Sequence, residues 1–98
     1  MRIISKKALQ DFYSQYPDSK IPLENWYRIV KKEQWTCFTD IKKTFNTVDN
    51  VGNKRYVFNI KGNDYRIVTI IQFRIKAVLI RFVGTHTQYD KIKDIKKI

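Results

Sequence analysis

Apolar residues in the first third of the chain recur at the spacing of an amphipathic helix. The apolar start at residues 1–4 predicts a short strand, and Ser5 is suited to cap the helix that follows. One helical stripe, with apolar residues at positions i, i+3, i+4 and i+7, consists of Leu9, Phe12, Tyr13 and Tyr16. Pro17 ends this helix, because the residue before a proline is pushed out of helical geometry.

A second helix of the same kind is expected to begin at Pro22, after a turn at residues 18–21. Its stripe consists of Leu23, Trp26, Tyr27 and Val30. Two such helices joined by a short proline-containing turn predict an αα-hairpin. We interpret the aromatic stripes as faces that pack on a sheet rather than as platforms for stacked bases. Residues 40–45 then predict a short helical turn, and residues 46–54 predict a loop.

The hydrophobic period changes from 3.6 to 2 in the second half of the chain. Residues 55–61 alternate as a strand with one core face, formed by Tyr56, Phe58 and Ile60. Gly62-Asn63 predicts a tight turn, because glycine accepts a positive φ without steric cost. The apolar residues 65–73 predict the returning strand, 74–76 a turn and 77–84 a third strand. Residues 89–98 predict a short amphipathic or frayed helix.

This order of elements predicts an α+β fold for a single domain that spans residues 1–98. In this prediction the N-terminal strand and the αα-hairpin pack on a small antiparallel sheet. A short C-terminal helix or tail completes the fold.

The charge balance narrows the class of partner. The chain has 20 Lys and Arg against 9 Asp and Glu, a net charge of +11, which favours nucleic acid, an acidic protein or an anionic membrane surface. No stretch approaches the roughly 20 apolar residues of a membrane span. The apolar part of the N-terminal segment is too short for the apolar region of a signal peptide. The single cysteine, Cys37, fits a reducing compartment. We therefore expect a cytoplasmic protein with no membrane partner.

The only histidine, His86, follows the last apolar run and precedes Tyr89 by three residues. An ordinary imidazole has a pKa of about 6.5, so this side chain can donate or accept a proton near neutral pH. Taken alone, such a histidine is more often a half-buried residue at a strand end.

Polar and cationic side chains interrupt the predicted strands. They are Arg55, Asn59, Lys61, Arg66, Arg81 and His86. An antiparallel meander brings strand ends together, so these groups are candidates for one phosphate-binding surface. The alternation of side chains along a strand does not show that all these groups lie on one face of the sheet, because Arg81 and His86 are an odd number of residues apart. Each cation taken singly fits a solvated surface charge.

The chain has no metal-ligand pattern and no glycine-rich phosphate loop, so we expect neither a metal nor a cofactor. RNA cleavage without a metal would use the 2′-hydroxyl of the substrate as nucleophile. That reaction needs a base, an acid and cations around the phosphate. His86, Tyr89 and the Arg/Lys set match these needs by residue type.

Several short motifs follow one another along nearly the whole chain. They are Pro22-Leu23-x-x-Trp26-Tyr27, Trp35, Asp40-Ile-Lys, Val51-Gly-Asn, Val57-Phe-Asn-Ile-Lys-Gly-Asn63, Tyr65-Arg66 and Arg81-Phe-Val-Gly-Thr-His86-x-x-Tyr89-Asp90. Together they resemble the HigB-type toxins of the RelE-like superfamily of bacterial toxin–antitoxin systems. The resemblance implies a ribosome-dependent mRNA endonuclease that inhibits translation. It also implies a cognate antitoxin, which is usually a DNA-binding helix-turn-helix protein, and a toxin that is itself monomeric.

The resemblance implies a catalytic set of His86, Tyr89, Arg66 and Lys61. In it Arg66 contacts phosphate, His86 acts as general acid or base, Tyr89 stacks on a base or handles a proton, and Lys61 assists. The residues expected to bind RNA or phosphate are Arg55, Asn59, Arg81 and Lys91. Val57 and Asn59 are not lysines, so the chain lacks part of the cationic set of the best-known relatives. The identity of the general base therefore stays open.

Two other function classes fit the same charge. One is a basic module that binds RNA or the ribosome without chemistry, and it would not need His86. The other is a protein-interaction domain whose basic face docks an acidic partner. Cleaved RNA distinguishes the toxin from both.

Overall fold

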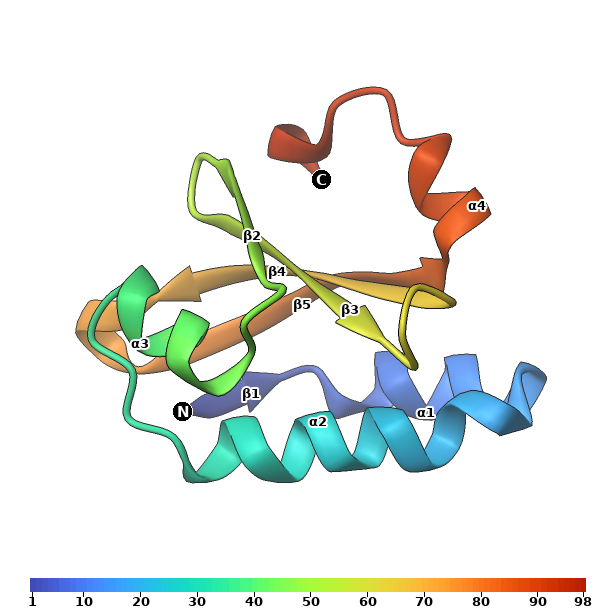
Figure 1. Cartoon of the computed structure of the whole chain (residues 1–98), viewed down its shortest axis with the longest axis horizontal. Coiled ribbons are helices and arrows are strands. Elements are labelled where there is room, and N and C mark those ends of the chain that lie inside the picture. The colour runs from blue at the N-terminus through green and yellow to red at the C-terminus, as the bar shows by residue number, and fades with distance from the viewer.

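A five-stranded mixed sheet forms the centre of the molecule in the computed structural model, which describes all 98 residues (Figure 1). The strands are β1 (Arg2–Ile4), β2 (Asp49–Gly52), β3 (Arg55–Ile60), β4 (Tyr65–Gln72) and β5 (Ala77–Thr85). Their order in the sheet is β1-β5-β4-β3-β2. Only β1 runs parallel to its neighbour, and the other pairs are antiparallel.

Helices cover one face of this sheet. They include α1 (Lys6–Gln15), the 3-10 turn η1 (Pro17–Ser19), α2 (Lys20–Lys32) and α3 (Phe38–Thr44). Helices α1 and α2 form the predicted αα-hairpin, and its apolar stripe is buried at Leu9, Leu23 and Trp26. Helix α2 begins two residues before Pro22, which lies within its first turn. Ser5 precedes α1 without a side-chain cap hydrogen bond.

Phe58 on β3 is the centre of the core between the helices and the sheet. Its ring centroid lies 5.3 Å from that of Trp26, 6.2 Å from that of Trp35 and 5.4 Å from that of Phe45. Phe58 is buried together with Tyr56 and Ile60, which confirms the predicted core face of this strand. This aromatic group packs with buried Leu, Ile and Val side chains in one continuous core, whose burial stabilises the fold.

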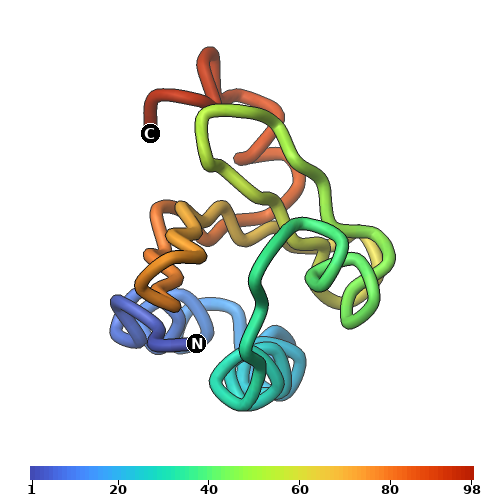
Figure 2. Tube along the Cα trace, turned by 90° about the vertical axis from the view of Figure 1, so that its left-hand side faces the viewer, coloured from blue at the N-terminus to red at the C-terminus, as the bar shows by residue number.

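The C-terminal segment covers the other face of the sheet. It consists of α4 (His86–Asp90) and a tail that contains the 3-10 turn η3 (Ile95–Lys97). Asn53 Nδ2 donates to the Lys96 carbonyl at 2.8 Å, and Arg55 Nη2 donates to the Ile98 carbonyl at 2.6 Å. Figures 1 and 2 show the tail and the helical layer on opposite sides of the strands.

Two expectations from the sequence are wrong in detail. Residues 46–54 are not all loop, because β2 pairs Asp49 with Val57 and Asn50 with Tyr56. This edge strand has polar side chains at its start and a bulge at Val51, so it has no hydrophobic alternation to detect. The tail is also not a continuous helix, because α4 already ends at Asp90.

The sheet also departs from the predicted three-stranded antiparallel meander. It gains β1 and β2 at its two edges, and β1 is parallel to β5. Strand β5 extends one residue further than predicted, to Thr85. The tight turn is confirmed, with Gly62 at φ 65°, and Lys76 ends the 3-10 turn η2 (Phe73–Ile75) in left-handed geometry. No helix in the structure is both long enough and apolar enough to span a membrane.

Candidate functional site

Arg66 lies beside Tyr89 on the face of the sheet that the C-terminal segment covers. The guanidinium carbon is 5.9 Å from the centroid of the Tyr89 ring. Arg66 Nη1 donates to the carbonyls of Asn63 at 2.8 Å and Tyr65 at 3.2 Å, which orients the guanidinium. Nε and Nη2 have no acceptor within the protein, so these donors are available to a phosphate.

The strands on either side of Arg66 place an amide on one side and closely packed side chains on the other. Asn59 on β3 and Gly84 on β5 are the register partners of Arg66. Side chains at such positions are cross-strand neighbours, so Asn59 adds a hydrogen-bonding amide next to the guanidinium. Gly84 is buried under Phe82 and Gln88, because a Cβ there would lie 2.4 Å from Phe82 Cζ and 2.8 Å from Gln88 Oε1, so only glycine fits.

Helix α4 fixes the positions of His86 and Tyr89. A capping box begins the helix: Thr85 Oγ1 accepts from Gln88 N at 3.1 Å, and Gln88 Oε1 accepts from Thr85 N at 2.9 Å. The His86 amide donates to the Asp64 carbonyl at 3.0 Å, which ties α4 to the β3–β4 turn. Residues three apart on a helix are neighbours on its surface, so α4 places His86 next to Tyr89, although no side-chain hydrogen bond or ion pair joins the imidazole to Tyr89 or Arg66.

The His86 ring is open to solvent. Its side chain is 55% exposed, and its Nδ1 atom lies 3.6 Å from Asp90 Oδ2. Since Nδ1 faces this carboxylate, Nε2 is the ring nitrogen left for a substrate. Asp90 belongs to the motif that carries the family resemblance, but sequence reasoning assigned it no role.

Burial raises the pKa of the Tyr89 phenol above its ordinary value. The carboxylate of Asp49 adds to this rise, and the Arg66 guanidinium opposes it. The phenol therefore stays protonated at neutral pH, where it can donate a hydrogen bond or stack but does not act as a base. We call Asn59, Arg66, His86 and Tyr89 the Arg66 cluster.

Lys61 lies at the same end of the sheet but is held by carboxylates. Its ammonium is 2.9 Å from Asp18 on η1 and 3.6 Å from Asp64. The hydrogen bond to Asp18 raises the pKa of Lys61. Lys61 has a φ of 53° and follows the last residue of β3, so it belongs to the turn. The strand alternation expected from the sequence therefore does not extend to Lys61.

Arg55 is engaged in holding the tail. Besides its bond to Ile98, its Nη1 donates to the Asn53 carbonyl at 3.1 Å, and its Nε is buried without a partner. Arg81 is exposed at a bulge in β5, where Val68 pairs with Phe82 and Thr69 with Ile80. Lys91 is exposed directly after α4. No ion pair or hydrogen bond joins Arg81 or Lys91 to the Arg66 cluster.

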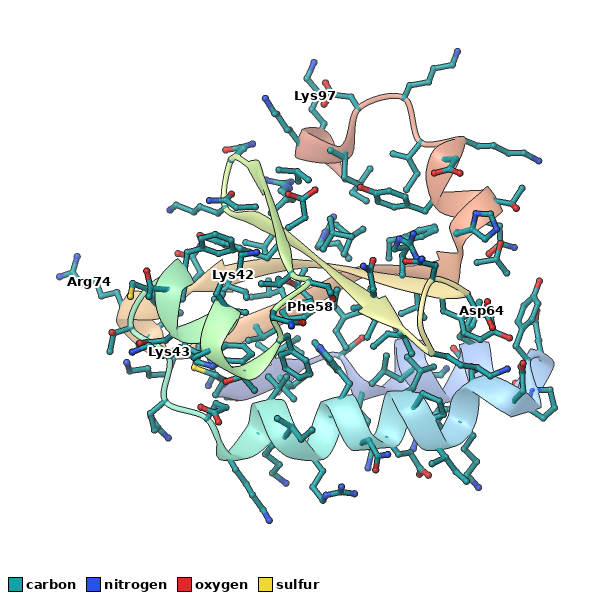
Figure 3. All side chains as sticks on the ribbon, viewed as in Figure 1. Lys42, Lys43, Phe58, Asp64, Arg74 and Lys97 are labelled. Carbon is teal, nitrogen blue, oxygen red and sulfur yellow. The ribbon has the colours of Figure 1, made fainter.

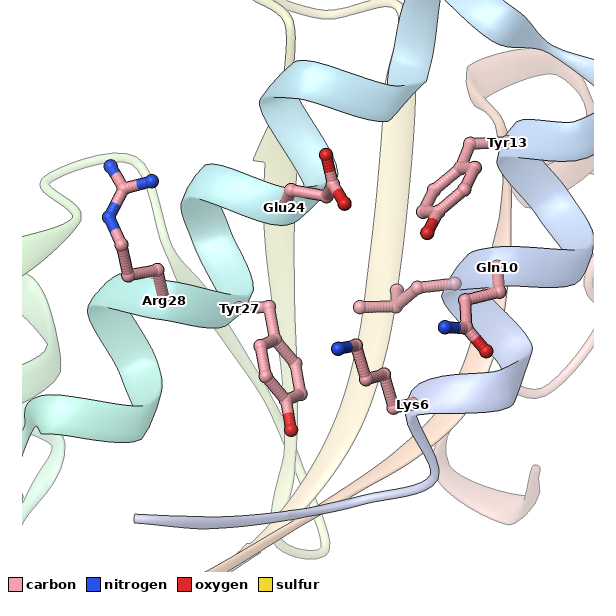
Figure 4. Close-up of a pocket in the computed structure, with 7 residues that line it drawn as sticks. Lys6, Gln10, Tyr13, Glu24, Tyr27 and Arg28 are labelled. Atoms are coloured by element: carbon pink, nitrogen blue, oxygen red, sulfur yellow. The ribbon is translucent and has the colours of Figure 1, made fainter.

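The Arg66 cluster lies on an open surface rather than in a cavity. One cavity of about 290 Å³ lies between α1 and α2, where Tyr13, Tyr27 and Lys6 surround it (Figure 4). A second one, a groove of about 600 Å³, lies beside β1. Figure 3 shows Asp64, at the turn that holds α4, and Arg74 at opposite ends of the molecule. An open cationic surface suits an extended polymer better than a small molecule, which needs a concave pocket.

Comparison with known proteins identifies relatives along nearly the whole chain. The chain is 30% identical over 94 residues to the mRNA interferase HigB of Escherichia coli O6:H1, covering 94% of this chain and 91% of the relative. It is 35% identical over 92 residues to the mRNA interferase toxin HigB of Escherichia coli strain K12, covering 92% and 88%. The mRNA interferase HigB of Shigella flexneri gives the same values.

A family profile supports these pairwise matches. The HigB_toxin family, described as the RelE-like toxic component of a toxin-antitoxin system, matches residues 19–92. This range contains all of the Arg66 cluster, Asp90 and the β3–β4 hairpin. The α+β fold and the motifs quoted above agree with that match. The chain belongs to the HigB family of RelE-like toxins from toxin–antitoxin systems.

Proposed function

We propose that this protein is a ribosome-dependent mRNA endonuclease, the toxin of a type II toxin–antitoxin system, and that it inhibits translation by cutting mRNA. The curated relatives named as mRNA interferases support the reaction class. One observation carries the proposal to this chain. The Arg66 guanidinium, which has unused donors, lies beside the Tyr89 ring. The exposed imidazole of His86 is on the same short helix as that ring.

The proposed chemistry is transfer of the phosphoryl group within the RNA. The 2′-oxygen of the nucleotide attacks the adjacent phosphorus and loses its proton, and the bond from phosphorus to the 5′-oxygen of the next nucleotide breaks. The products are a 2′,3′-cyclic phosphate and a 5′-hydroxyl end. Arg66 binds the non-bridging oxygens and stabilises the charge that develops on them.

His86 exchanges a proton with the RNA through Nε2. The Asp90 carboxylate lies 3.6 Å from Nδ1, so its negative charge favours the proton on Nδ1 and leaves the lone pair of Nε2 free. In this role Asp90 is a positioning residue, because it acts only through the imidazole. Tyr89 stacks on a base beside the scissile phosphate, and Asn59 donates to the backbone.

The remaining candidate cations have subordinate roles in this proposal. Lys61 assists when the RNA phosphate competes with Asp18 and Asp64 for its ammonium. Arg81 and Lys91 are exposed and attract RNA by releasing counterions. Arg55 contributes least, because the tail occupies it.

The toxin–antitoxin family implies an antitoxin partner. We propose that this antitoxin is a DNA-binding helix-turn-helix protein and that the toxin is monomeric without it. We also place the toxin in the cytoplasm, where translating ribosomes are found.

The ends of the cleaved RNA test this function. In a reconstituted translation reaction, the wild-type protein is expected to cut a translated mRNA and leave a 2′,3′-cyclic phosphate. A deoxynucleotide placed 5′ of the cut should abolish cleavage at that position, since it lacks the nucleophile. Cleavage that is independent of translation would contradict the ribosome requirement. Ribosome binding with intact mRNA would instead favour the non-catalytic binding module.

A further inference from the structure

A second cationic surface lies at the end of the molecule far from the Arg66 cluster. It is the groove of about 600 Å³ formed where the start of β1, the end of α2 and the turn η2 meet. The residues that line this groove are Met1, Arg2, Lys31, Gln34, Ile75 and Lys76. We call it the β1 groove.

The cations of the β1 groove are not neutralised by carboxylates in its lining. Arg2 and Lys31 are exposed and make no ion pair, and Lys31 Nζ lies 5.9 Å from the centroid of the Tyr27 ring. Lys76 is held in place, because its Nζ donates to the Trp35 carbonyl at 2.9 Å. Arg74 is exposed in the turn η2 next to the groove (Figure 3).

Two carboxylates lie near the groove without lining it. Asp40 is occupied by Thr36, whose amide and hydroxyl both donate to Oδ2 at 2.8 Å, and Glu33 follows α2. The opposite end of the molecule is richer in acid. Asp18 and Asp64 flank Lys61, Asp90 flanks His86, and Asp49 lies near Tyr89. The β1 groove is therefore more uniformly cationic than the surface around the Arg66 cluster.

The lining of the groove points to an RNA backbone rather than to a peptide. A docked peptide is usually anchored by apolar side chains in apolar pockets. Here Met1 is buried and only Ile75, which is 62% exposed, presents an accessible apolar surface. Guanidinium and ammonium groups over an open polar groove instead match the spaced phosphates of a folded nucleic acid.

We infer that the β1 groove is a second RNA-binding surface, which takes the phosphate backbone of a folded ribosomal RNA while the Arg66 cluster acts on mRNA. This inference rests on the proposed function and adds an anchoring site to it. Arg2 pairs with Ala77 at the start of β5 and Arg66 with Gly84 near its end, so at about 3.3 Å per residue the two surfaces lie roughly 20 Å apart along this strand. The groove then holds the toxin in one orientation on the ribosome and takes no part in the chemistry.

Matched charge reversals test the inference. Arg2→Glu/Lys31→Glu changes the groove, and Lys7→Glu/Lys20→Glu changes the net charge equally elsewhere. The pairs are matched because all four residues are exposed, and one lysine of each pair lies over a tyrosine ring, Lys31 over Tyr27 and Lys20 over Tyr13. Binding to purified 70S ribosomes is measured from 50 to 300 mM salt, and circular dichroism checks that both variants are folded.

The groove variant is expected to bind ribosomes at least tenfold more weakly than the matched variant. Its plot of log affinity against log salt should be less steep by about two, one for each lost phosphate contact. Its rate of mRNA cleavage at saturating ribosome concentration should stay within about threefold of the wild-type rate.

Equal loss of affinity in the two variants would overturn the inference, because it would show a general effect of net charge. Unchanged ribosome binding with lost affinity for poly-glutamate, an acidic probe, would assign the groove to an acidic protein. Both results leave the proposed function intact if the wild-type protein still cuts mRNA. A wild-type protein that binds no ribosomes and cuts no mRNA would instead contradict the proposed function itself.

Discussion

At the scale of single residues, Tyr89 has the most clearly defined chemistry. Burial raises the pKa of its phenol, so the hydroxyl keeps its proton at neutral pH. Arg66 lies against its ring, so the side chain offers an aromatic surface next to a cation. We expect Tyr89→Phe to keep the cleavage rate within about threefold, because it keeps the ring. Tyr89→Ala should lower the rate by about 10- to 100-fold, since a base–aromatic stack contributes about 1–3 kcal/mol. Single-turnover cleavage of a translated mRNA measures both, and equal rates for the two variants would contradict a stacking role.

Asp18 gives the fold a dependence on acid pH. Hydrogen bonds from the Tyr65 hydroxyl and then from the Lys61 ammonium lower the pKa of this carboxyl below its ordinary value of 3.8. A lowered folded-state pKa stabilises the protein above that ordinary value, and the contribution is lost as the pH falls through the folded-state pKa.

We therefore expect Asp18→Asn to lower the Tm by a few degrees at pH 7 and by less as the pH falls below about 3.8. Thermal unfolding from pH 7 to pH 2 measures this difference. Asp11→Asn, at an exposed carboxylate without an ion pair, is the matched control. A Tm difference between wild type and Asp18→Asn that grows toward low pH would contradict the assignment.

At the same scale, residue type pointed to Arg66 and Tyr89, which the structure places side by side, whereas strand alternation also suggested cations that are held elsewhere. His86, Tyr89 and Arg66 stood out because they combine proton chemistry, an aromatic ring and a cation near strand ends. Arg55 was grouped with them from its place on the predicted strand, and Lys61 from that place and the family resemblance, and neither shows that Asp18 reaches Lys61 or that the tail occupies Arg55. Both contacts join residues 43 apart in the chain, and no local pattern contains that information.

At the scale of elements, the capping box of α4 links the sheet to the chemistry. Thr85 satisfies the Gln88 amide, and the helix is only five residues long, so it has little stability of its own. Thr85→Ala should cost about 1 kcal/mol and loosen the positions of His86 and Tyr89.

The expected result for Thr85→Ala is a fall in cleavage rate of about tenfold, with faster amide exchange confined to α4. Thr85→Ser, which keeps the capping hydroxyl, should restore both properties. Full activity in the alanine variant would show that the cap does not position the cluster.

Elements with strong periodicity could be predicted, and elements without it could not. The stripe of α2 is regular because this helix buries one face against Phe58, and the alternation of β3 is regular because Tyr56, Phe58 and Ile60 all enter the core. Strand β2 and the tail lack such a signal, since polar side chains form the sheet edge and backbone contacts to Asn53 and Arg55 hold the tail. The parallel pairing of β1 with β5 depends on the whole topology.

At the scale of the whole molecule, the sheet separates two kinds of surface. The helical layer buries the aromatic core, and Arg66 and Tyr89 meet on the opposite face, where the C-terminal segment lies (Figure 1). With a net charge of +11, the protein attracts RNA over its whole surface, but only the Arg66 cluster combines a phosphate donor, an imidazole and a stacking ring. In the proposed function, charge accounts for the encounter with RNA, and the cluster accounts for cleavage.

Single-turnover cleavage of a translated mRNA by Arg66→Ala, His86→Ala and the control Lys7→Ala tests this account most directly. Lys7 is exposed on α1, on the helical side of the sheet, and makes no ion pair. We expect the Arg66 and His86 variants to cut at least about 100-fold more slowly than the parent and the control to stay within twofold. Folded Arg66 and His86 variants that both cleave at the parental rate would contradict the account.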